Sequence, residues 1–246
     1  MWDNPRQLNI VSLALTALAL ALLTWGGMAW IVRQPMFAIR AVRIDGSLIR
    51  TSPAHLQAII REEIKGTFFT LRLADARASL LRVPWVRTIG LRREWPNALQ
   101  ITVGEHEPLA RWNETALVDR QGEVFIADYN GELPQFNGPE GTADEMTVGL
   151  QQFGALLAPA RLSIAELHLS PRGSWSIKTA GHTTLTIELG RTEPTDRLRR
   201  FLAYYGKTIA VLARAGTSVE YVDLRYRNGF AARLPGFKER PARKAA

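Results

Sequence analysis

The sequence predicts an α+β protein with a single N-terminal transmembrane helix and two folded domains. Three observations support this prediction: a long uncharged run near the N-terminus, a strand–helix–helix–strand–strand order after it, and a series of short strands in the remainder. The chain of 246 residues is also long for one compact domain. Hydrophobic residues make up 46% of the chain and charged residues 22%, which is typical of globular proteins.

The first expected element is a membrane anchor at residues 8–32. No charged residue lies between Arg6 and Arg33, a stretch of 26 residues. A helix of about 25 residues is roughly 37 Å long, enough to cross a hydrocarbon core of about 30 Å. Trp25 and Trp30 lie near its end, where indole rings favour the bilayer interface. A cleaved signal peptide has a shorter apolar stretch and a small-residue cleavage site, so we expect an uncleaved anchor.

Charge alone leaves open which side of the membrane the folded domains occupy. The short tail at residues 1–7 carries Arg6 against Asp3, whereas Arg33, Arg40 and Arg43 follow the anchor. Counted by the positive-inside rule, the C-terminal part would be cytoplasmic. Because long domains translocate largely regardless of charge, the count does not decide the orientation.

Residues 36–107 are expected to form the first folded domain. Its expected elements are a strand at 37–44, a helix with Ser52 as N-cap that Gly66 ends, a helix at about 73–82, and strands at 85–93 and 99–103 around a turn at 95–97. The helix after Ser52 carries apolar residues at helical spacing. Two helices on one face of a three-stranded sheet would bury these residues.

Residues 108–235 are expected to form a mainly β domain with two helices, followed by a basic tail at 236–246. Short apolar runs between Gly, Pro and Asn predict the strands. The expected strands are 117–118, 124–126, 165–169, 175–178, 184–189, 219–227 and 230–234, and the expected helices are about 144–157 and 195–212.

A partner site is predicted at the end of this second domain. Residues 219–227 alternate, and Asn228–Gly229 best fits a two-residue hairpin turn. The returning strand at 230–234 would lie at a sheet edge, with backbone groups open to an incoming partner strand. Arginine and aromatic side chains there are the types enriched in interfaces. The residues also allow a protected hairpin whose arginines only discourage aggregation.

Composition and motifs exclude several kinds of chemistry. The absence of cysteine excludes disulfides, iron–sulfur clusters, thiolate zinc sites and cysteine nucleophiles. The chain lacks the sequence signatures of phosphate-binding loops, dinucleotide-binding loops, serine hydrolases and zinc proteases. A net charge of +8 fits nucleic acid, anionic lipid or an acidic protein as a partner. Because the basic residues are spread along the chain, we expect no nucleic-acid binding.

One local cluster, Glu105-His106-Glu107, suggests a metal or an acid–base site. On a strand, Glu105 and Glu107 would share one face and His106 the other, so the three side chains would not converge. We therefore expect no metal, no cofactor and no catalytic residue. A pair of carboxylates brought together from distant positions, as in glycosidases, stays open.

Short motifs recur in a specific order along nearly the whole chain. They include Pro84-Trp85-Val86-Arg87, Arg93-x-Trp95-Pro96-Asn97-x-Leu99, Glu105-His106-x-Pro108, Ala110-Arg111-Trp112, Gly122-Glu123-Val124-Phe125, Arg172-Gly173-x-Trp175, Leu189-Gly190-Arg191 and Val222-Asp223-Leu224-Arg225-Tyr226. In order and spacing they resemble the FtsQ/DivIB family of bacterial cell-division proteins.

The resemblance implies a POTRA domain at 36–107 and a β domain at 108–235, both in the periplasm. It implies a single-pass type II protein of the cell inner membrane, with a cytoplasmic N-terminus, located at the division septum. Its expected role is a non-enzymatic, essential-type divisome scaffold that binds FtsB and FtsL, links early and late division proteins including FtsK, and helps control septal peptidoglycan synthesis.

The resemblance also implies that FtsB docks along the last strands. The implied contact residues are Arg225, Tyr226, Asn228, Gly229, Phe230, Ala231 and Arg233, with Arg172 added from an earlier turn. The stretch after Tyr226 departs from the family pattern, so Phe230 and Arg233 need not act as their family equivalents do. A membrane-anchored periplasmic cell-wall hydrolase is the alternative from another class. A POTRA chaperone for outer-membrane proteins fits less well, because only one POTRA unit is expected and no barrel.

Overall fold

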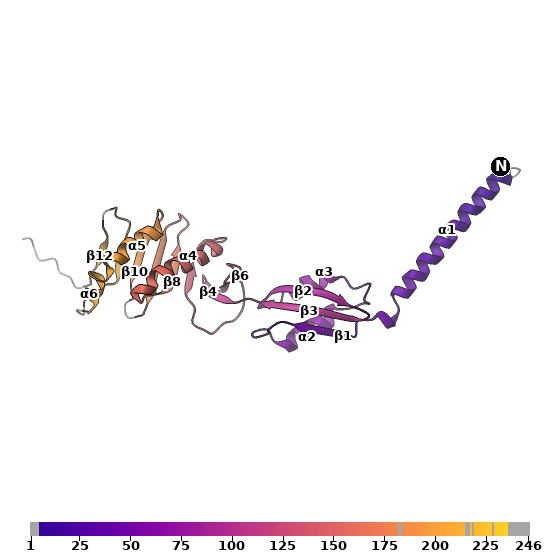
Figure 1. Ribbon diagram of the computed structural model, residues 1–246, viewed down its shortest axis with the longest axis horizontal. Coiled ribbons are helices and arrows are strands. Elements are labelled where there is room, and N and C mark those ends of the chain that lie inside the picture. The colour runs from indigo at the N-terminus through magenta and orange to yellow at the C-terminus, as the bar shows by residue number, and fades with distance from the viewer. Residues whose placement is uncertain (1–4, 182–183, 215–216, 218, 228, 236–246) are drawn as a thin grey trace, which may run out of the picture. The chain divides into compact units, whose positions relative to one another are not determined.

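The computed structural model describes residues 5–181, 184–214, 217, 219–227 and 229–235 (Figure 1). Residues 1–4 of the expected N-terminal tail, Asn228 of the expected turn and the whole basic tail at 236–246 lie outside the described residues. The chain divides into two compact units, Met1–Glu105 and His106–Ala246.

Helix α1 spans Pro5–Val32 and contains the expected anchor. Its segment Leu8–Val32 has a mean hydropathy of 2.0, and none of its side chains is buried against the rest of the chain. Helix α1 is therefore long and apolar enough to cross a membrane. A short 3₁₀ turn, η1 (Pro35–Phe37), follows it.

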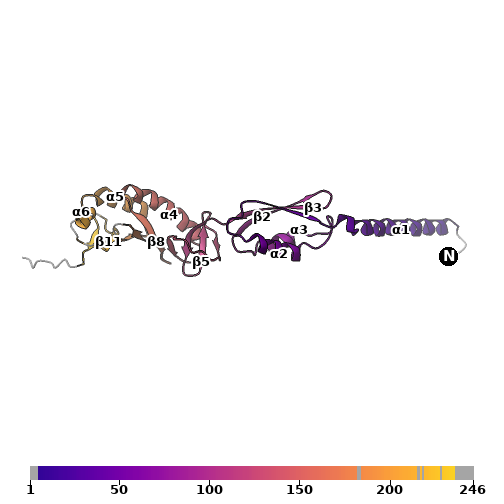
Figure 2. The same ribbon diagram turned by 90° about the horizontal axis from the view of Figure 1, so that it is seen from below.

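The rest of the first unit, which we call the small unit, has the expected β-α-α-β-β order. Strand β1 (Ala41–Asp45) pairs in parallel with β3 (Ala98–Glu105), which pairs antiparallel with β2 (Val86–Glu94). Helices α2 (Pro53–Glu63) and α3 (Leu73–Leu80) lie together on one face of this sheet (Figure 2). The helices and the sheet bury one shared core, in which Leu56, Leu80, Leu99 and Ile101 are fully buried.

Two boundaries in the small unit differ from the expectation. The strand expected at 37–44 begins only at Ala41, because Pro35 starts a 3₁₀ turn whose carbonyl accepts the N–H of Ala38. Helix α2 ends at Glu63, before Gly66, which follows it with a φ of +129°. Ser52 occupies the N-cap position, but its side chain makes no capping hydrogen bond.

The second unit, which we call the large unit, is built on one nine-stranded sheet with the order β12-β11-β10-β9-β8-β7-β4-β5-β6. Helices α4 (Ala143–Leu157) and α5 (Pro194–Tyr205) cover one face of it (Figure 2). The strands are β4 (Pro108–Trp112), β5 (Ala116–Asp119), β6 (Val124–Phe125), β7 (Gln135–Asn137), β8 (Ser163–Leu169), β9 (Trp175–Ala180), β10 (Thr186–Gly190), β11 (Tyr221–Asp223) and β12 (Ala231–Arg233). A second 3₁₀ turn, η2 (Ala158–Ala160), follows α4.

Sequence patterns did not reveal every element of the large unit. Strands β4 and β7 were not expected, and they pair in parallel with each other inside the sheet, between β8 and β5. The helix expected at 195–212 is divided into α5 and α6 (Ile209–Arg214). At the break, the N–H groups of Lys207 and Thr208 donate to carbonyls three residues earlier, which tightens the chain into a turn.

The register of β11 with β12 differs from the one that a two-residue turn at Asn228–Gly229 predicts; Asn228 itself lies outside the described residues. Such a turn would pair Arg227 with Phe230, the residues on either side of it. Each preceding residue would then pair with the next following one, Tyr226 with Ala231 first. Instead Tyr221 pairs with Arg233, Val222 with Ala232 and Asp223 with Ala231. This register closes a longer loop between β11 and β12. Strand β11 therefore ends at Asp223, much earlier than the strand expected at 219–227.

The junction between the units lies between Glu105 and His106, whereas the sequence placed it between 107 and 108. The side chains explain the position. The carboxylate of Glu105 accepts backbone N–H bonds from Ile49 (3.0 Å), Arg50 (3.0 Å) and Thr51 (2.7 Å) of the small unit. The neighbouring His106 instead contacts Asp119 of the large unit.

The pKa of Glu105 is lowered in the folded protein. Burial opposes ionisation and raises the pKa, but the hydrogen bonds from residues 49–51 to the carboxylate outweigh it. Because the folded-state pKa lies below the unfolded one, the carboxylate stabilises the fold above the unfolded pKa. That contribution is lost as the pH falls through the folded pKa.

We predict that Glu105→Gln lowers the free energy of unfolding at pH 7 by about 1–3 kcal/mol, the value typical of hydrogen bonds to a charged group. The difference from wild type should shrink as the pH falls below the ordinary pKa of a glutamate and through the lowered pKa of Glu105, because the wild-type carboxylate then also becomes protonated. Denaturant unfolding of the full chain in detergent, at pH 7 and at low pH, measures the loss of unfolding free energy at each pH.

Glu107→Gln is the matched control for this experiment. Its carboxylate pairs with Arg120, and both side chains are about two-thirds exposed. An exposed pair of this kind contributes less than about 1 kcal/mol. A stability loss in Glu105→Gln that does not depend on pH, or one no larger than in the control, would contradict this role.

Candidate functional site

The hydrogen bonds of β11 decide which backbone groups of β12 are open. In the parallel pair of β10 and β11, the N–H of Thr186 donates to the carbonyl of Glu220 (2.9 Å), and that of Leu224 donates to the carbonyl of Glu188 (2.8 Å). Alternate residues of a strand face opposite neighbours. The carbonyl of Glu220 and the N–H of Leu224 therefore face β10, as do the backbone groups of Val222 between them. Tyr221 and Asp223 face β12, and the N–H of Glu220, just before the strand, also donates to β12 through the carbonyl of Arg233 (3.4 Å).

The same alternation continues into β12, the outermost strand at this end of the described sheet. Ala231 pairs with Asp223 and Arg233 with Tyr221, so the backbone groups of Ala231 and Arg233 are used inside the sheet. The N–H and C=O of Ala232 consequently point to the open edge. The side chains of Ala231 and Arg233 are exposed, whereas that of Ala232 is half-buried against the core.

Phe230 anchors the start of β12 to helix α5. Its ring lies 5.2 Å from that of the buried Phe201, in an edge-to-face arrangement. The side chain is half-buried and packs against the core of the large unit. Phe230 therefore fixes the position of the edge, in addition to any contact with a partner.

Arg225 is held by Asp223. The guanidinium contacts both carboxylate oxygens, with 2.9 Å from Nε to Oδ1 and 2.7 Å from Nη2 to Oδ2, and the Arg225 N–H also donates to Oδ1. These hydrogen bonds lower the pKa of Asp223, and the same pairing raises the pKa of Arg225. The Arg225 side chain is nevertheless 58% exposed. It is a positively charged group held in one position and open to a partner.

Two ionisable groups beside this pair are shifted towards their neutral forms. Burial is the largest cause in both, and it raises the pKa of Glu188 and of Tyr221. The nearby carboxylate of Asp223 raises both further, while Arg225 opposes the shift. The Asp223–Arg225 pair therefore modifies, in opposite directions, shifts that burial mainly causes.

Gly190 leaves room for two arginines at the end of β10. Its φ is +78°, and a Cβ added there would lie 2.6 Å from Nη1 of Arg197 and 3.0 Å from Cγ of Arg225. Arg197 donates to the carbonyl of Leu189 (2.8 Å) and to Oγ1 of Thr192 (2.9 Å). A residue with a side chain at position 190 would displace these arginines.

A groove of about 500 Å³ lies between α5 and the loop that connects β11 and β12. Arg200 spans it by donating to the carbonyl of Arg227 (3.4 Å). Tyr204 on the helix and Tyr226 on the loop are both about 60% exposed. The groove is lined by Arg197, Arg200, Phe201, Tyr204, Thr208, Leu224, Tyr226, Arg227, Gly229 and Phe230.

The structure brings most of the predicted site residues together. Tyr226, Gly229 and Phe230 line the groove, and Arg225, Ala231 and Arg233 lie on or beside the same edge. Arg172 lies on the turn between β8 and β9, where the adjacent Gly173 approaches Arg191, and it does not belong to the groove lining among the described residues. Asn228 lies outside the described residues.

Sequence reasoning missed the contribution of α5 to the groove. Its apolar stripe was recognised, but Arg200, Tyr204 and Thr208 follow one another at helical spacing along the neighbouring face. That spacing was a usable signal. The contribution of α5 was not predicted, because no local feature of the sequence indicates that α5 lies beside β12.

The cluster at 105–107 does not converge on one site. Glu105 bonds to residues 49–51, His106 contacts Asp119, and Glu107 pairs with Arg120. Nδ1 of His106 lies 2.8 Å from Oδ2 of the fully buried Asp119, and its ring stacks on Phe125 at 4.1 Å. Together with Glu123, these two form a group of potential metal ligands. Oδ1 of Asp119 already accepts the backbone N–H groups of Gln121 and Glu123, so this cluster serves to hold the turn after β5.

Comparison with known proteins identifies the family. The model for the POTRA domain, FtsQ-type, matches residues 37–106, and that for the cell division protein FtsQ/DivIB, C-terminal, matches residues 110–225. The cell division protein FtsQ of Burkholderia pseudomallei is 40% identical over 97% of this chain and 96% of its own length. Those of Nitrosospira multiformis (36%; 95% and 99%) and Bordetella pertussis (32%; 99% and 100%) are similarly related. The chain therefore belongs to the FtsQ/DivIB family of cell-division proteins.

Proposed function

We propose that this chain acts in cell division as a single-pass scaffold of the bacterial inner membrane, with both folded units in the periplasm. In this proposal it binds FtsB and FtsL at the septum, joins them to other division proteins including FtsK, and so helps control septal peptidoglycan synthesis. The observation that carries the proposal is the open edge of β12, where Ala232 directs its backbone N–H and C=O away from the sheet.

The edge suits addition of a partner strand. A strand that pairs with β12 would satisfy the outward backbone groups of Ala232, and this pairing supplies affinity without depending on side-chain identity. Packing of Phe230 on Phe201 fixes the edge strand before the partner arrives. Less ordering is then required on binding, which favours affinity.

The groove beside the edge supplies selectivity. Exposed Tyr204 and Tyr226 offer aromatic contact area, and Arg197, Arg200 and Arg227 surround them with positive charge. A complementary partner segment would carry an apolar or aromatic residue for the groove and acidic residues around it. We assign FtsB to this site, because the resemblance of the chain to the FtsQ/DivIB family implies that FtsB docks along the last strands.

The proposal includes no catalytic step. The groups at this site offer backbone pairing, aromatic surface and fixed positive charge, and these suit binding. The proposal accordingly requires no cofactor and no metal.

We predict that Ala232→Pro weakens binding of the cognate FtsB by at least about tenfold. Proline removes the outward N–H, and an unpaired group on the partner costs about 1–3 kcal/mol. Because that N–H makes no bond inside the described sheet, the unfolding temperature should change little. Titration of FtsB into the full-length chain in detergent, with a parallel thermal melt, measures both quantities.

Ala231→Pro is the matched control for the edge. Its N–H faces Asp223 inside the sheet, so this variant should lose stability. If Ala232→Pro binds FtsB like wild type, or if the two variants lose stability equally, the assignment of the open edge is wrong.

We predict that Tyr226→Ala loses on the order of 2 kcal/mol of FtsB binding, roughly thirtyfold, as expected for an aromatic hot spot. The matched control is Ile126→Ala, which removes a 79% exposed side chain just after β6, at the opposite end of the same sheet. Isothermal titration of both variants gives the comparison. Wild-type affinity in Tyr226→Ala, or an equal loss in both variants, would remove Tyr226 from the interface.

A further inference from the structure

Four aromatic rings form a cluster at one end of the small unit. Phe37 comes from η1, Phe68 and Phe69 from the connection between α2 and α3, and Trp95 from the turn between β2 and β3. The ring centroids are 5.1 Å apart for Phe37–Phe69, 5.2 Å for Phe68–Phe69, 5.6 Å for Phe68–Trp95 and 6.0 Å for Phe37–Trp95. We call this cluster the aromatic tip.

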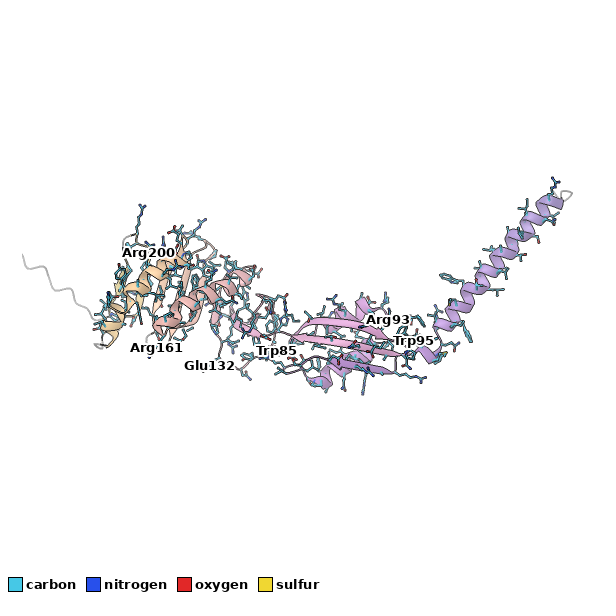
Figure 3. All side chains as sticks on the ribbon, in the orientation of Figure 1. Trp85, Arg93, Trp95, Glu132, Arg161 and Arg200 are labelled. Atoms are coloured by element: carbon cyan, nitrogen blue, oxygen red, sulfur yellow. The ribbon has the colours of Figure 1, made fainter. Side chains whose placement is uncertain are left out.

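The aromatic tip is not part of the buried core. Trp95 is 68% exposed and Phe69 is 47% exposed, and the neighbouring Met36 is 66% exposed. The opposite end of the small unit differs, since Trp85 there is 9% exposed and lies under the guanidinium of Arg50 (Figure 3). The large exposed rings are thus concentrated at one end of the domain. Such exposure of apolar surface marks an interaction site.

The aromatic tip is joined to the end of the membrane helix. Oγ1 of Thr67 donates to the carbonyl of Val32, the last residue of α1, at 2.9 Å. Phe68 donates its N–H to the carbonyl of Phe37 (2.7 Å), and Ala38 bridges to Thr67. Phe37 follows Val32 by five residues, so even a fully extended connection would keep them within about 18 Å.

Basic residues accompany each of the three segments. Exposed Arg33 and Arg40 flank η1, exposed Lys65 precedes the two phenylalanines, and exposed Arg92 lies near Trp95. Two further arginines are engaged within the domain: Arg72 pairs with Asp75 (2.7 Å), and Arg93 donates to the carbonyl of Leu71. The only acidic residue within residues 33–40, 64–72 and 92–97 is Glu94, which is paired with Arg43. Exposed aromatic rings surrounded by basic residues are suited to bind a layer that has apolar groups inside and anionic groups at its surface. The phospholipid headgroup layer has this character.

We propose that the aromatic tip inserts into the phospholipid headgroup layer beside the end of α1. The rings lie at the boundary between headgroups and acyl chains, and the surrounding basic residues contact lipid phosphates. Insertion covers the exposed faces of Trp95 and Phe69 and holds the small unit against the bilayer. The domain is thereby attached to the membrane at two places, through α1 and through the tip.

The absence of cysteine permits a direct test in the full-length chain. Phe69→Cys and Ile49→Cys are each labelled with a solvent-sensitive fluorophore. Each labelled chain is placed alone in a nanodisc, together with a lipid that carries a nitroxide quencher near its headgroup. Ile49 is the matched control, because it is an exposed apolar residue (76%) on the loop between β1 and α2, remote from the three segments of the tip. We expect several-fold stronger quenching at position 69. Equal quenching at both positions, or none at position 69, would overturn the proposal.

A second variant separates insertion from simple tethering by α1. Adding Trp95→Ser to the Phe69→Cys chain should reduce the quenching at position 69. Adding it to the Ile49→Cys chain should leave the quenching at position 49 unchanged. Nanodiscs of phosphatidylcholine with phosphatidylglycerol should give stronger quenching than phosphatidylcholine alone. If Trp95→Ser leaves the quenching at position 69 unchanged, the connection to α1 alone accounts for the quenching, and the proposal is wrong. No division protein is present in these samples, so the result is independent of partner binding at β12.

Discussion

The site at the end of the large unit depends on one backbone constraint, the alternation of hydrogen-bonding direction along β11 and β12. The bonds of Thr186 and Leu224 direct the carbonyl of Glu220 and the N–H of Leu224 towards β10, and the backbone groups of Val222 between them face the same way. The register with β12 then leaves Ala232 facing outward. A shift of one residue would instead expose the backbone groups of Ala231 and Arg233 and would turn Ala232 away from the core. The same register that packs the half-buried side chain of Ala232 against the core therefore creates the edge.

The side chains around the edge hold this register and give it a charge. Phe230 packs on Phe201, and Asp223 fixes Arg225 through two pairs of atoms. Gly190 leaves the space that Arg197 and Arg225 occupy. Part of the net charge of +8 is thus placed in a defined arrangement at a groove, and another part surrounds the aromatic tip of the small unit. In our two proposals, the groove binds a peptide segment and the aromatic tip binds a lipid layer, and both surfaces combine basic with aromatic residues.

Local patterns in the sequence predicted the elements that depend on local spacing. Helices α1 to α4 and the pair β2–β3 follow from apolar periodicity and turn residues. Strand β7 has three residues, and its two partners β4 and β8 are distant in the chain and pair with it in parallel. Strand β4 pairs with β7 and also, antiparallel, with the neighbouring β5. Asn228–Gly229 gave a strong local turn signal, but the pairing of β11 with β12 overrides it. For the same reason, the aromatic tip and the α5 side of the groove, which combine distant segments, were not foreseen.

Amide hydrogen exchange at Ala232 tests the central claim most directly. In the chain alone, the N–H of Ala232 should exchange rapidly, while those of Ala231 and Arg233 are protected by β11. With FtsB bound, Ala232 should become protected, and Ala231 and Arg233 should stay protected, because strand addition pairs the outward groups and leaves the inner ones unchanged. An Ala232 amide that exchanges as rapidly in the FtsB complex as in the chain alone would contradict strand addition at this edge.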